Sequence, residues 1–289
     1  MKTAFVFPGQ GAQTVGMGLG LAEKYLEQAN TILGFDLKKI VLEGPEEELK
    51  KTAVTQPAIF VISVAMFEQL TANGLRPDFV AGHSLGEYSA LYAAGAISFA
   101  DGVKILNRRG QFMQEAVPIG QGAMAALLGG DRATIAAICA AVGNVWPANF
   151  NSPGQVVISG KKEAVESAGE KLKAAGVKKV IPLAVSAPFH CPLMQPAADK
   201  LKKELEKIAL NEAQVPVIAN VTAQPVTGAA EIRELLYKQV TSSVLWEDSV
   251  RKMIADGVNS FVEVGPGKVL AGLIKKIDSN VEVKSFSEM

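Results

Sequence analysis

Residues 79–94 have the sequence FVAGHSLGEYSALYAA, in which a short apolar run leads through a serine between two glycines into a helical pattern. We predict a strand over 79–82, a helix over 87–94 and a tight turn over the GHSLG segment between them. The pattern G-x-S-x-G between a strand and a helix is typical of a nucleophile elbow, whose strained backbone leaves room only for small neighbours. The segment therefore predicts an α/β fold with a reactive serine at the end of a strand.

Ser84 is the candidate nucleophile of this elbow. Its hydroxyl would be exposed at the start of a helix, where the amide of Leu85 and the positive end of the helix dipole face a developing oxyanion. The alternative is a Gly-Ser turn that only connects the strand to the helix. Because the strand and the helix stand where the motif requires them, we favour the catalytic interpretation.

A serine hydroxyl needs a general base, and the sequence offers two histidines, His83 and His190. His83 is the direct neighbour of Ser84, so at a strand-like turn its side chain should point away from the hydroxyl. His190 lies between Pro188 and Pro192, and these prolines restrict the backbone that carries the imidazole. We predict that His190 is the base; the alternative is a structural histidine in the core.

A second oxyanion donor is expected from a loop that follows another strand. The segment FPGQGAQ at 7–13 comes directly after an apolar run and fits this position. It does not fit a dinucleotide fingerprint, because Thr14 stands where G-x-G-x-x-G requires its third glycine. The sequence also contains no G-x-x-x-x-G-K-[ST] phosphate loop.

Short apolar runs alternate with helical periodicity along most of the chain. We predict strands over 4–7, 79–82, 215–219 and 260–264, with helices between them that include 56–73 and 192–208. This alternation predicts a parallel α/β sheet.

The middle of the chain breaks this alternation. Its predicted elements are a strand over 123–128, a helix over 132–142, a strand over 145–150, a turn over 151–154, a strand over 155–159, a helix over 163–175 and a strand over 177–183. The order β-α-β-β-α-β is that of the ferredoxin-like split motif. We expect a small domain inserted into the larger one; the alternative is an excursion of the main sheet.

The composition is that of an ordinary globular protein, and 289 residues suffice for one or two domains. Lys+Arg and Asp+Glu number 29 each, so no net charge draws the chain towards nucleic acid or acidic lipid. Two cysteines, Cys139 and Cys191, cannot form a disulfide framework, and with two histidines a zinc site is not expected. The apolar runs 4–7 and 58–67 are too short for a signal-peptide core or a membrane span. We expect a cytoplasmic protein without nucleic-acid, membrane or metal partners.

Five motifs along the chain together carry a resemblance to a known family. They are FPGQG at 7–11, GHSLGE at 82–87, RGQFMQ at 109–114, NFNSPGQ at 149–155 and EVGPG at 263–267. With these motifs the chain resembles the bacterial malonyl-CoA:acyl carrier protein transacylases over nearly all of its length. The resemblance implies an α/β-hydrolase-like parallel-sheet domain formed by 1–121 and 190–289, with a ferredoxin-like (βαββαβ) insertion at 122–189.

The resemblance also implies an activity and a set of catalytic residues. The enzyme would move the malonyl group from malonyl-CoA to the phosphopantetheine thiol of holo acyl carrier protein through a malonyl-serine intermediate, for fatty-acid biosynthesis. This chemistry requires no cofactor, and we expect the enzyme to act as a monomer. Ser84 would be the nucleophile, His190 its base, and the main-chain carbonyl of Gln239 would orient the histidine. The amides of Gln10 and Leu85 would form the oxyanion hole.

Arg109 is the residue that separates this activity from that of a generic esterase. The resemblance implies that it binds the malonyl carboxylate, whereas composition and spacing alone would make it a solvent-exposed helix arginine. A serine hydrolase or esterase acting on acyl thioesters would share Ser84 and His190 without a need for Arg109. The chain could also be a loading acyltransferase of a polyketide pathway, or a catalytically idle docking module of a larger synthase.

Overall fold

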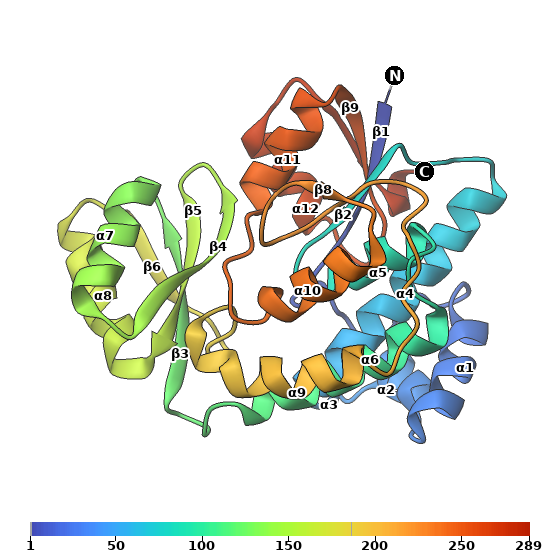
Figure 1. Cartoon of the computed structure of the whole chain (residues 1–289), viewed down its shortest axis with the longest axis horizontal. Helices are drawn as coiled ribbons and strands as arrows, with labels where there is room; N and C mark the ends of the chain where they lie inside the picture. Colours follow the sequence, from blue (N-terminus) through green and yellow to red (C-terminus); the bar gives the residue numbers. More distant parts are fainter. Residues whose placement is uncertain (1, 186) are drawn as a thin grey trace.

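Two β-sheets organise the chain in the computed structural model, which describes residues 2–185 and 187–289 (Figure 1). The strands of the larger one, the large sheet, are β1 (Lys2–Phe7), β2 (Phe79–Gly82), β7 (Val217–Ile218), β8 (Pro225–Val226), β9 (Val258–Glu263) and β10 (Glu282–Ser285). Their order is β10-β9-β1-β2-β7-β8, and only the short β8 pairs antiparallel. The predicted parallel α/β sheet is therefore confirmed.

The strands of the large sheet differ slightly from the predicted ones. The run at 79–82 is reproduced, whereas the run predicted at 215–219 shortens to Val217–Ile218. Strand β10 was not predicted, because Val283 is the one apolar side chain among its four residues EVKS, which lie at a sheet edge. In the middle of the sheet, Phe7 at the end of β1 lies opposite Gly82, so that the loops after β1 and β2 leave the sheet side by side.

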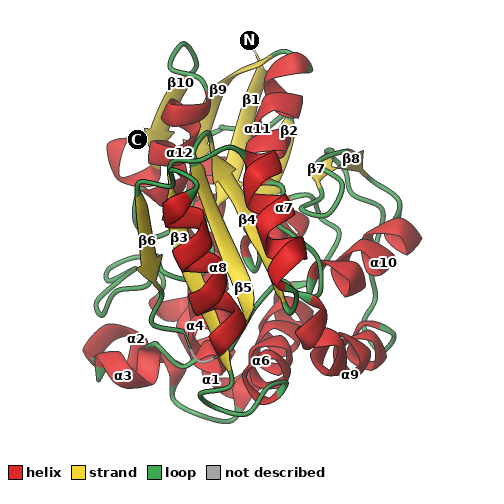
Figure 2. Ribbon diagram, turned by 90° about the vertical axis from the view of Figure 1, so that its left-hand side faces the viewer, coloured by secondary structure: helices red, strands yellow, loops and turns green. Residues whose placement is uncertain are grey.

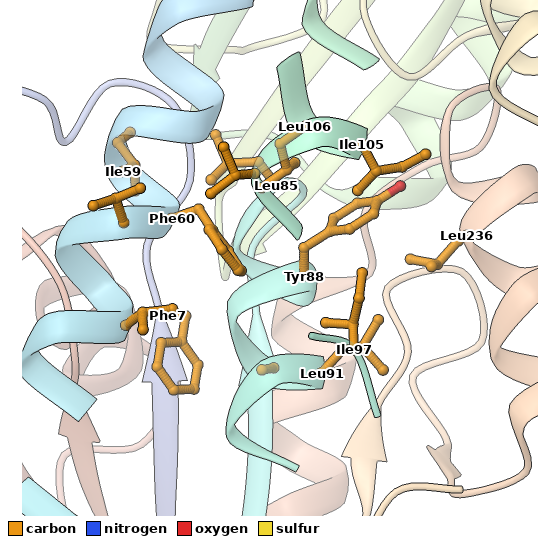
Figure 3. Close-up of a cluster of buried hydrophobic side chains, with 14 of the residues drawn as sticks. Phe7, Ile59, Phe60, Leu85, Tyr88, Leu91, Ile97, Ile105, Leu106 and Leu236 are labelled. Atoms are coloured by element: carbon orange, nitrogen blue, oxygen red, sulfur yellow. The ribbon is translucent and has the colours of Figure 1, made fainter. Parts of the chain in front are cut away.

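Helices cover both faces of the large sheet. They are α1 (Glu23–Leu33), α2 (Leu37–Glu43), α3 (Glu46–Leu49), α4 (Thr52–Ala72), α5 (Gly86–Ala93), α6 (Phe99–Glu115), α9 (Gln195–Leu205), α10 (Ala229–Gln239), α11 (Trp246–Ala255) and α12 (Val269–Ile277). Alternate residues of β1 enter different cores: Phe5 and Phe7 pack with α4, α5 and α6, while Ala4 and Val6 pack with α11 and α12. Figure 3 shows part of the first core, with Phe7, Phe60 and Leu85 among its members.

Helix α4 begins a turn earlier than predicted, which places Pro57 inside it. A proline cannot donate to the carbonyl four residues before it, here that of Ala53. The side chain of Asn107 in α6 donates to this carbonyl instead, at 2.9 Å. Among the described helices, α4 has the length and apolar composition of a membrane span, but 72% of its apolar window is buried inside the structure, as in the core helix of a globular protein.

The small sheet is a separate four-stranded antiparallel sheet within the described residues. Its strands are β3 (Gly122–Leu128), β4 (Val145–Ser152), β5 (Gln155–Lys161) and β6 (Lys179–Pro182), in the order β4-β5-β3-β6. Helices α7 (Arg132–Val142) and α8 (Lys162–Ala174) cover one of its faces (Figure 2). Leu127, Ile135 and Ile158 belong to the core between these helices and strands, which is distinct from the two cores of the large sheet.

Candidate active site

The turn between β2 and α5 holds Ser84 in the left-handed region, with φ of 53°. The neighbouring glycines explain how this turn closes. A Cβ at Gly82 would collide with the backbone of Gly86, and a Cβ at Gly86 would collide with the carbonyl of Phe7 in β1. Only glycine fits at both positions, and the strained backbone of Ser84 lifts its side chain out of the sheet, as an elbow requires.

Ser84 and His190 meet although 106 residues separate them. Ser84 Oγ lies 2.8 Å from His190 Nε2, and His190 Nδ1 lies 3.0 Å from the main-chain oxygen of Gln239 at the end of α10. A carbonyl can only accept, so Nδ1 carries the proton and Nε2 accepts the hydroxyl proton of Ser84. This is the tautomer that a general base needs. His190 itself has a φ of 57°.

The surroundings keep the imidazole of His190 neutral. Burial, and in second place the Arg109 guanidinium, lowers the pKa of His190 to about 3. A neutral imidazole is ready to accept a proton at physiological pH. The geometry and the electrostatics therefore agree on a base rather than on a fixed cation.

Arg109 lies inside the molecule and not on an exposed helix face. Its side chain is 1% exposed, and Nη2 donates to Ser84 Oγ at 3.0 Å and to Gln239 Oε1 at 2.8 Å. Nη1 donates to Gln56 Oε1 at 2.8 Å, and Nε has no partner in the described part of the chain. All of these acceptors are neutral, and burial lowers the pKa of the guanidinium. A buried guanidinium held by neutral groups is a site for an anion.

Polar residues that the sequence analysis did not identify fix the elbow. Asn220, which follows β7, accepts from the amide of Ser84 at 2.7 Å and donates to the carbonyl of Gly82 at 2.7 Å. Glu87 in the first turn of α5 accepts from the amide of Asn220 at 2.9 Å. Burial raises the pKa of Glu87 to about 7. Gln56, inside the apolar helix α4, was missed as well.

These residues surround a cavity of about 130 Å³. It is lined by Gln10, Gln56, His83, Ser84, Leu85, Arg109, Met113, Met124, Asn149, Leu183, Val185, Phe189 and His190. The two predicted oxyanion residues, Gln10 and Leu85, thus reach the same space as Ser84. Among the described residues, neither of their amides donates a hydrogen bond to another group. Such amides are available to a ligand.

His83 connects the elbow to the small sheet. Its Nε2 lies 2.9 Å from Oδ1 of Asn151 in β4, and its ring lies 5.8 Å from that of Trp246. The structure thus directs His83 to Asn151 and leaves the proton of Ser84 to His190. No group of three or more His, Cys, Asp or Glu side chains is placed to hold a metal ion in residues 2–185 and 187–289.

Comparison with known proteins gives a consistent result. The family described as acyl transferase domain matches residues 4–287. The malonyl CoA-acyl carrier protein transacylase of Escherichia coli is 52% identical over 295 residues, covering 99% of this chain and 96% of that protein. An acyl carrier protein S-malonyltransferase structure from Vibrio cholerae has a TM-score of 0.96 and 47% identity, covering 99% of this chain and 96% of that one. A malonyl-transacylase solved in complex with a type II polyketide-synthase acyl carrier protein has a TM-score of 0.95 and 46% identity, covering 99% and 95%.

Proposed function

The chain belongs to the acyl transferase domain family, and we propose that it is an acyl-carrier-protein S-malonyltransferase. It transfers the malonyl group of malonyl-CoA to the phosphopantetheine thiol of holo acyl carrier protein. The names of the relatives support this activity, and the site supports it independently.

The observation that carries the proposal is the pairing of Arg109 with Ser84. A guanidinium without an acidic hydrogen-bond partner, 3.0 Å from a serine hydroxyl that also contacts a neutral histidine, suits an acyl group with a terminal carboxylate. An uncharged acyl group would leave the buried cation without a carboxylate in hydrogen-bond contact. Malonyl is the short acyl group that places a carboxylate two carbon–carbon bonds from the thioester carbonyl.

In the first half-reaction the Ser84 hydroxyl gives its proton to His190 Nε2 as Oγ attacks the thioester carbonyl. The amides of Gln10 and Leu85 stabilise the oxyanion, and each such donor contributes about 3 kcal/mol in well-studied acyl-transfer enzymes. The carbon–sulfur bond then breaks, His190 returns the proton to the CoA sulfur, and malonyl-serine forms. The Gln239 carbonyl stabilises the imidazolium through Nδ1.

The second half-reaction repeats these steps with the thiol of the carrier protein. His190 takes the thiol proton, the sulfur attacks the malonyl ester, and His190 then protonates the departing Ser84 Oγ. The free enzyme is regenerated, so that the overall kinetics are ping-pong. Malonyl-CoA and holo acyl carrier protein are thus the two partners that this mechanism requires.

A serine hydrolase acting on acyl thioesters is the main alternative, and it would use water in the second step. Incubation of the purified chain with labelled malonyl-CoA, with and without holo acyl carrier protein, tests the two. We expect a malonyl adduct on Ser84 that is discharged to the carrier protein. Release of free malonate at the rate of adduct decay, with no loading of the carrier, would contradict the transferase.

We also propose a two-domain organisation for this activity. Residues 1–121 and 190–289 form an α/β-hydrolase-like domain, and residues 122–189 form a ferredoxin-like insertion. The order β3-α7-β4-β5-α8-β6 with antiparallel pairing, and the separate core of the small sheet, support the insertion.

The physiological setting that we propose is fatty-acid biosynthesis in the cytoplasm, with the enzyme acting as a monomer. A loading step for polyketide synthesis uses the same chemistry. The comparison of loading rates for the fatty-acid and polyketide carrier proteins of one organism would distinguish the two pathways.

A further inference from the structure

The side chain of Gln239 lies at the centre of the site, where it contacts three functional groups. Its Oε1 accepts from Arg109 Nη2 at 2.8 Å, and its Nε2 donates to the carbonyl of Ser84 at 3.0 Å and to Glu87 Oε2 at 2.9 Å. The main chain of the same residue holds His190. The arginine, the nucleophile and the base are thus all connected to one buried glutamine.

A side-chain amide can take two orientations that exchange its oxygen and its nitrogen. Here only one of them satisfies the surroundings. If the amide were turned over, its NH₂ would face the Arg109 guanidinium, which can only donate, and its oxygen would face the acceptors of Glu87 and Ser84. Each buried mismatch of this kind costs about 1–3 kcal/mol. The orientation seen in the structure therefore depends on the acceptors on the far side of the amide.

Glu87 is the nearer of the two side chains that accept from Gln239 Nε2, at 2.9 Å against 3.4 Å for Asn220 Oδ1, and it is 3% exposed. Its Oε2 accepts both from Gln239 Nε2 and from the amide of Asn220, which in turn holds the amide of Ser84. Glu87 makes no contact with Ser84 Oγ or with His190 in the described contacts. Its hydrogen bonds reach the site through Gln239 and Asn220, whereas its charge also acts on the nearby Arg109 guanidinium, whose pKa it raises.

We propose that Glu87 is a positioning residue for malonyl selection: its carboxyl oxygen sets the orientation of the Gln239 amide, so that Gln239 Oε1 holds the Arg109 guanidinium beside Ser84. This inference rests on the proposed function. It is an acceptor role, and it needs the oxygen rather than the charge. Without that oxygen the Gln239 Nε2 keeps only the Ser84 carbonyl at 3.0 Å and the more distant Asn220 Oδ1 at 3.4 Å as acceptors, so the amide is held less firmly in the orientation that places the guanidinium for the substrate carboxylate.

The test compares Glu87→Leu with Glu87→Gln in the full-length chain. Loading of Ser84 from malonyl-CoA and from acetyl-CoA is followed by intact mass, and the ratio of the two rates is the readout. We expect Glu87→Leu to lower the malonyl-to-acetyl ratio about tenfold or more, mainly through malonyl loading. Glu87→Gln should stay within about threefold of the parent, because an amide oxygen can accept the same two hydrogen bonds.

Glu263→Leu is the matched control. Glu263 is also a buried carboxyl that accepts from main-chain amides, those of Leu270 and Ala271 at the start of α12. Its loss should lower the midpoint of thermal unfolding and leave the ratio unchanged. A merely structural role of Glu87 would give the same result as this control, with both substrates affected alike.

A second variant, Gln239→Met, removes the amide and keeps the main-chain carbonyl that holds His190. We expect the malonyl-to-acetyl ratio to decrease as it does in Glu87→Leu. The double variant with Glu87→Leu should show no further decrease, because the two residues act in series. An unchanged ratio in Gln239→Met would overturn the proposal even if Glu87→Leu failed to fold. A parent that does not prefer malonyl would instead refute the proposed function, whereas a selective parent with a selective Glu87→Leu variant refutes this inference alone.

Discussion

The large-sheet and small-sheet parts of the chain line one cavity but contribute different things to it. Ser84, Arg109, Gln239 and His190 come from the elbow, α6, α10 and the loop before α9, all packed around the large sheet. The small sheet contributes lining side chains such as Met124. Reactive groups are thus held on one side by buried hydrogen bonds, and the other side shapes the space. Chemistry and acyl-group size should therefore be separable by mutation.

Ser84→Ala should have the largest effect, because it removes the nucleophile on the large-sheet side. We expect no covalent malonyl adduct by intact mass and a loss of transfer of at least about 10⁴-fold. Ser89→Ala is the control, since Ser89 is a buried serine of α5, the helix that follows Ser84, and its hydroxyl has no partner among the described residues. An adduct that maps to Cys191 or to any other side chain would show that the nucleophile is misassigned.

Arg109→Ala should come second and should affect charged acyl groups selectively. Loss of a buried charge partner predicts about a 100-fold lower rate of malonyl loading, whereas acetyl loading should be spared or even raised. The control is Arg108→Ala, because Arg108 is the exposed neighbour and its side chain donates only to Gln111 among the described contacts. Equal malonyl-to-acetyl selectivity in the Arg109 variant and the parent would refute the carboxylate role.

Met124→Ala tests the small-sheet side and should have a smaller effect. The wider cavity should accept methylmalonyl-CoA better, with malonyl transfer reduced by less than about tenfold, at a cost of about 2–4 kcal/mol in the free energy of unfolding. Met253→Ala in α11 removes a comparable buried methionine that does not line the cavity. A loss of malonyl transfer as large as that of Ser84→Ala would show that chemistry and acyl-group size are not contributed separately by the large-sheet and small-sheet sides.

The smallest expected effect is on the pH dependence of stability. The pKa of His190 is lowered from its ordinary 6.5 to about 3. Below pH 6.5 the unfolded chain therefore binds a proton that the folded chain does not, and the stability decreases as the pH falls. The pKa of Glu87 is raised from 4.5 to about 7, so between these values the folded chain binds the extra proton, and stability rises as pH falls. Between pH 4.5 and 6.5 the two contributions oppose each other, each by about 1.4 kcal/mol per pH unit at most.

Urea unfolding of two variants from pH 4.5 to 7.5 separates these contributions. Relative to the parent, His190→Gln should become more stable as the pH falls from 6.5, and Glu87→Gln should become less stable as it falls from 7. Parallel pH profiles for the parent and both variants would show that neither group titrates as its surroundings indicate.

The sequence predicted the reactive pair better than the groups that support it. G-x-S-x-G is a local motif, and with two histidines in the chain the base could be found by elimination. Arg109 and Gln239 were reached only through family resemblance, because nothing local shows that a helix arginine is buried. Glu87, Asn220 and Gln56 were missed, since their contacts join residues 53 to 136 positions apart. A polar residue inside an apolar helix, as at Gln56, was the available signal.

The prediction of the fold was limited in the same way, by features that have no local signal in the sequence. Strands with a clear apolar run, such as β1 and β2, were predicted in place, whereas β10 at the polar edge was not. The start of α4 was misplaced because a proline is a common first residue of a helix. The compensating donor, Asn107, comes from a different helix and has no local signature.

The hydrogen bond from Asn107 does more than satisfy the Ala53 carbonyl that Pro57 leaves without an amide donor. Asn107 lies two residues before Arg109 on α6, and Gln56 lies three residues after Ala53 on α4, so one contact sets the register in which Gln56 reaches the guanidinium. The two helices are in this respect a single module. Recombination between homologues that exchanged α6 alone would separate the arginine from its matched glutamine, whereas a chimera that inherits 52–115 as one block would keep them together.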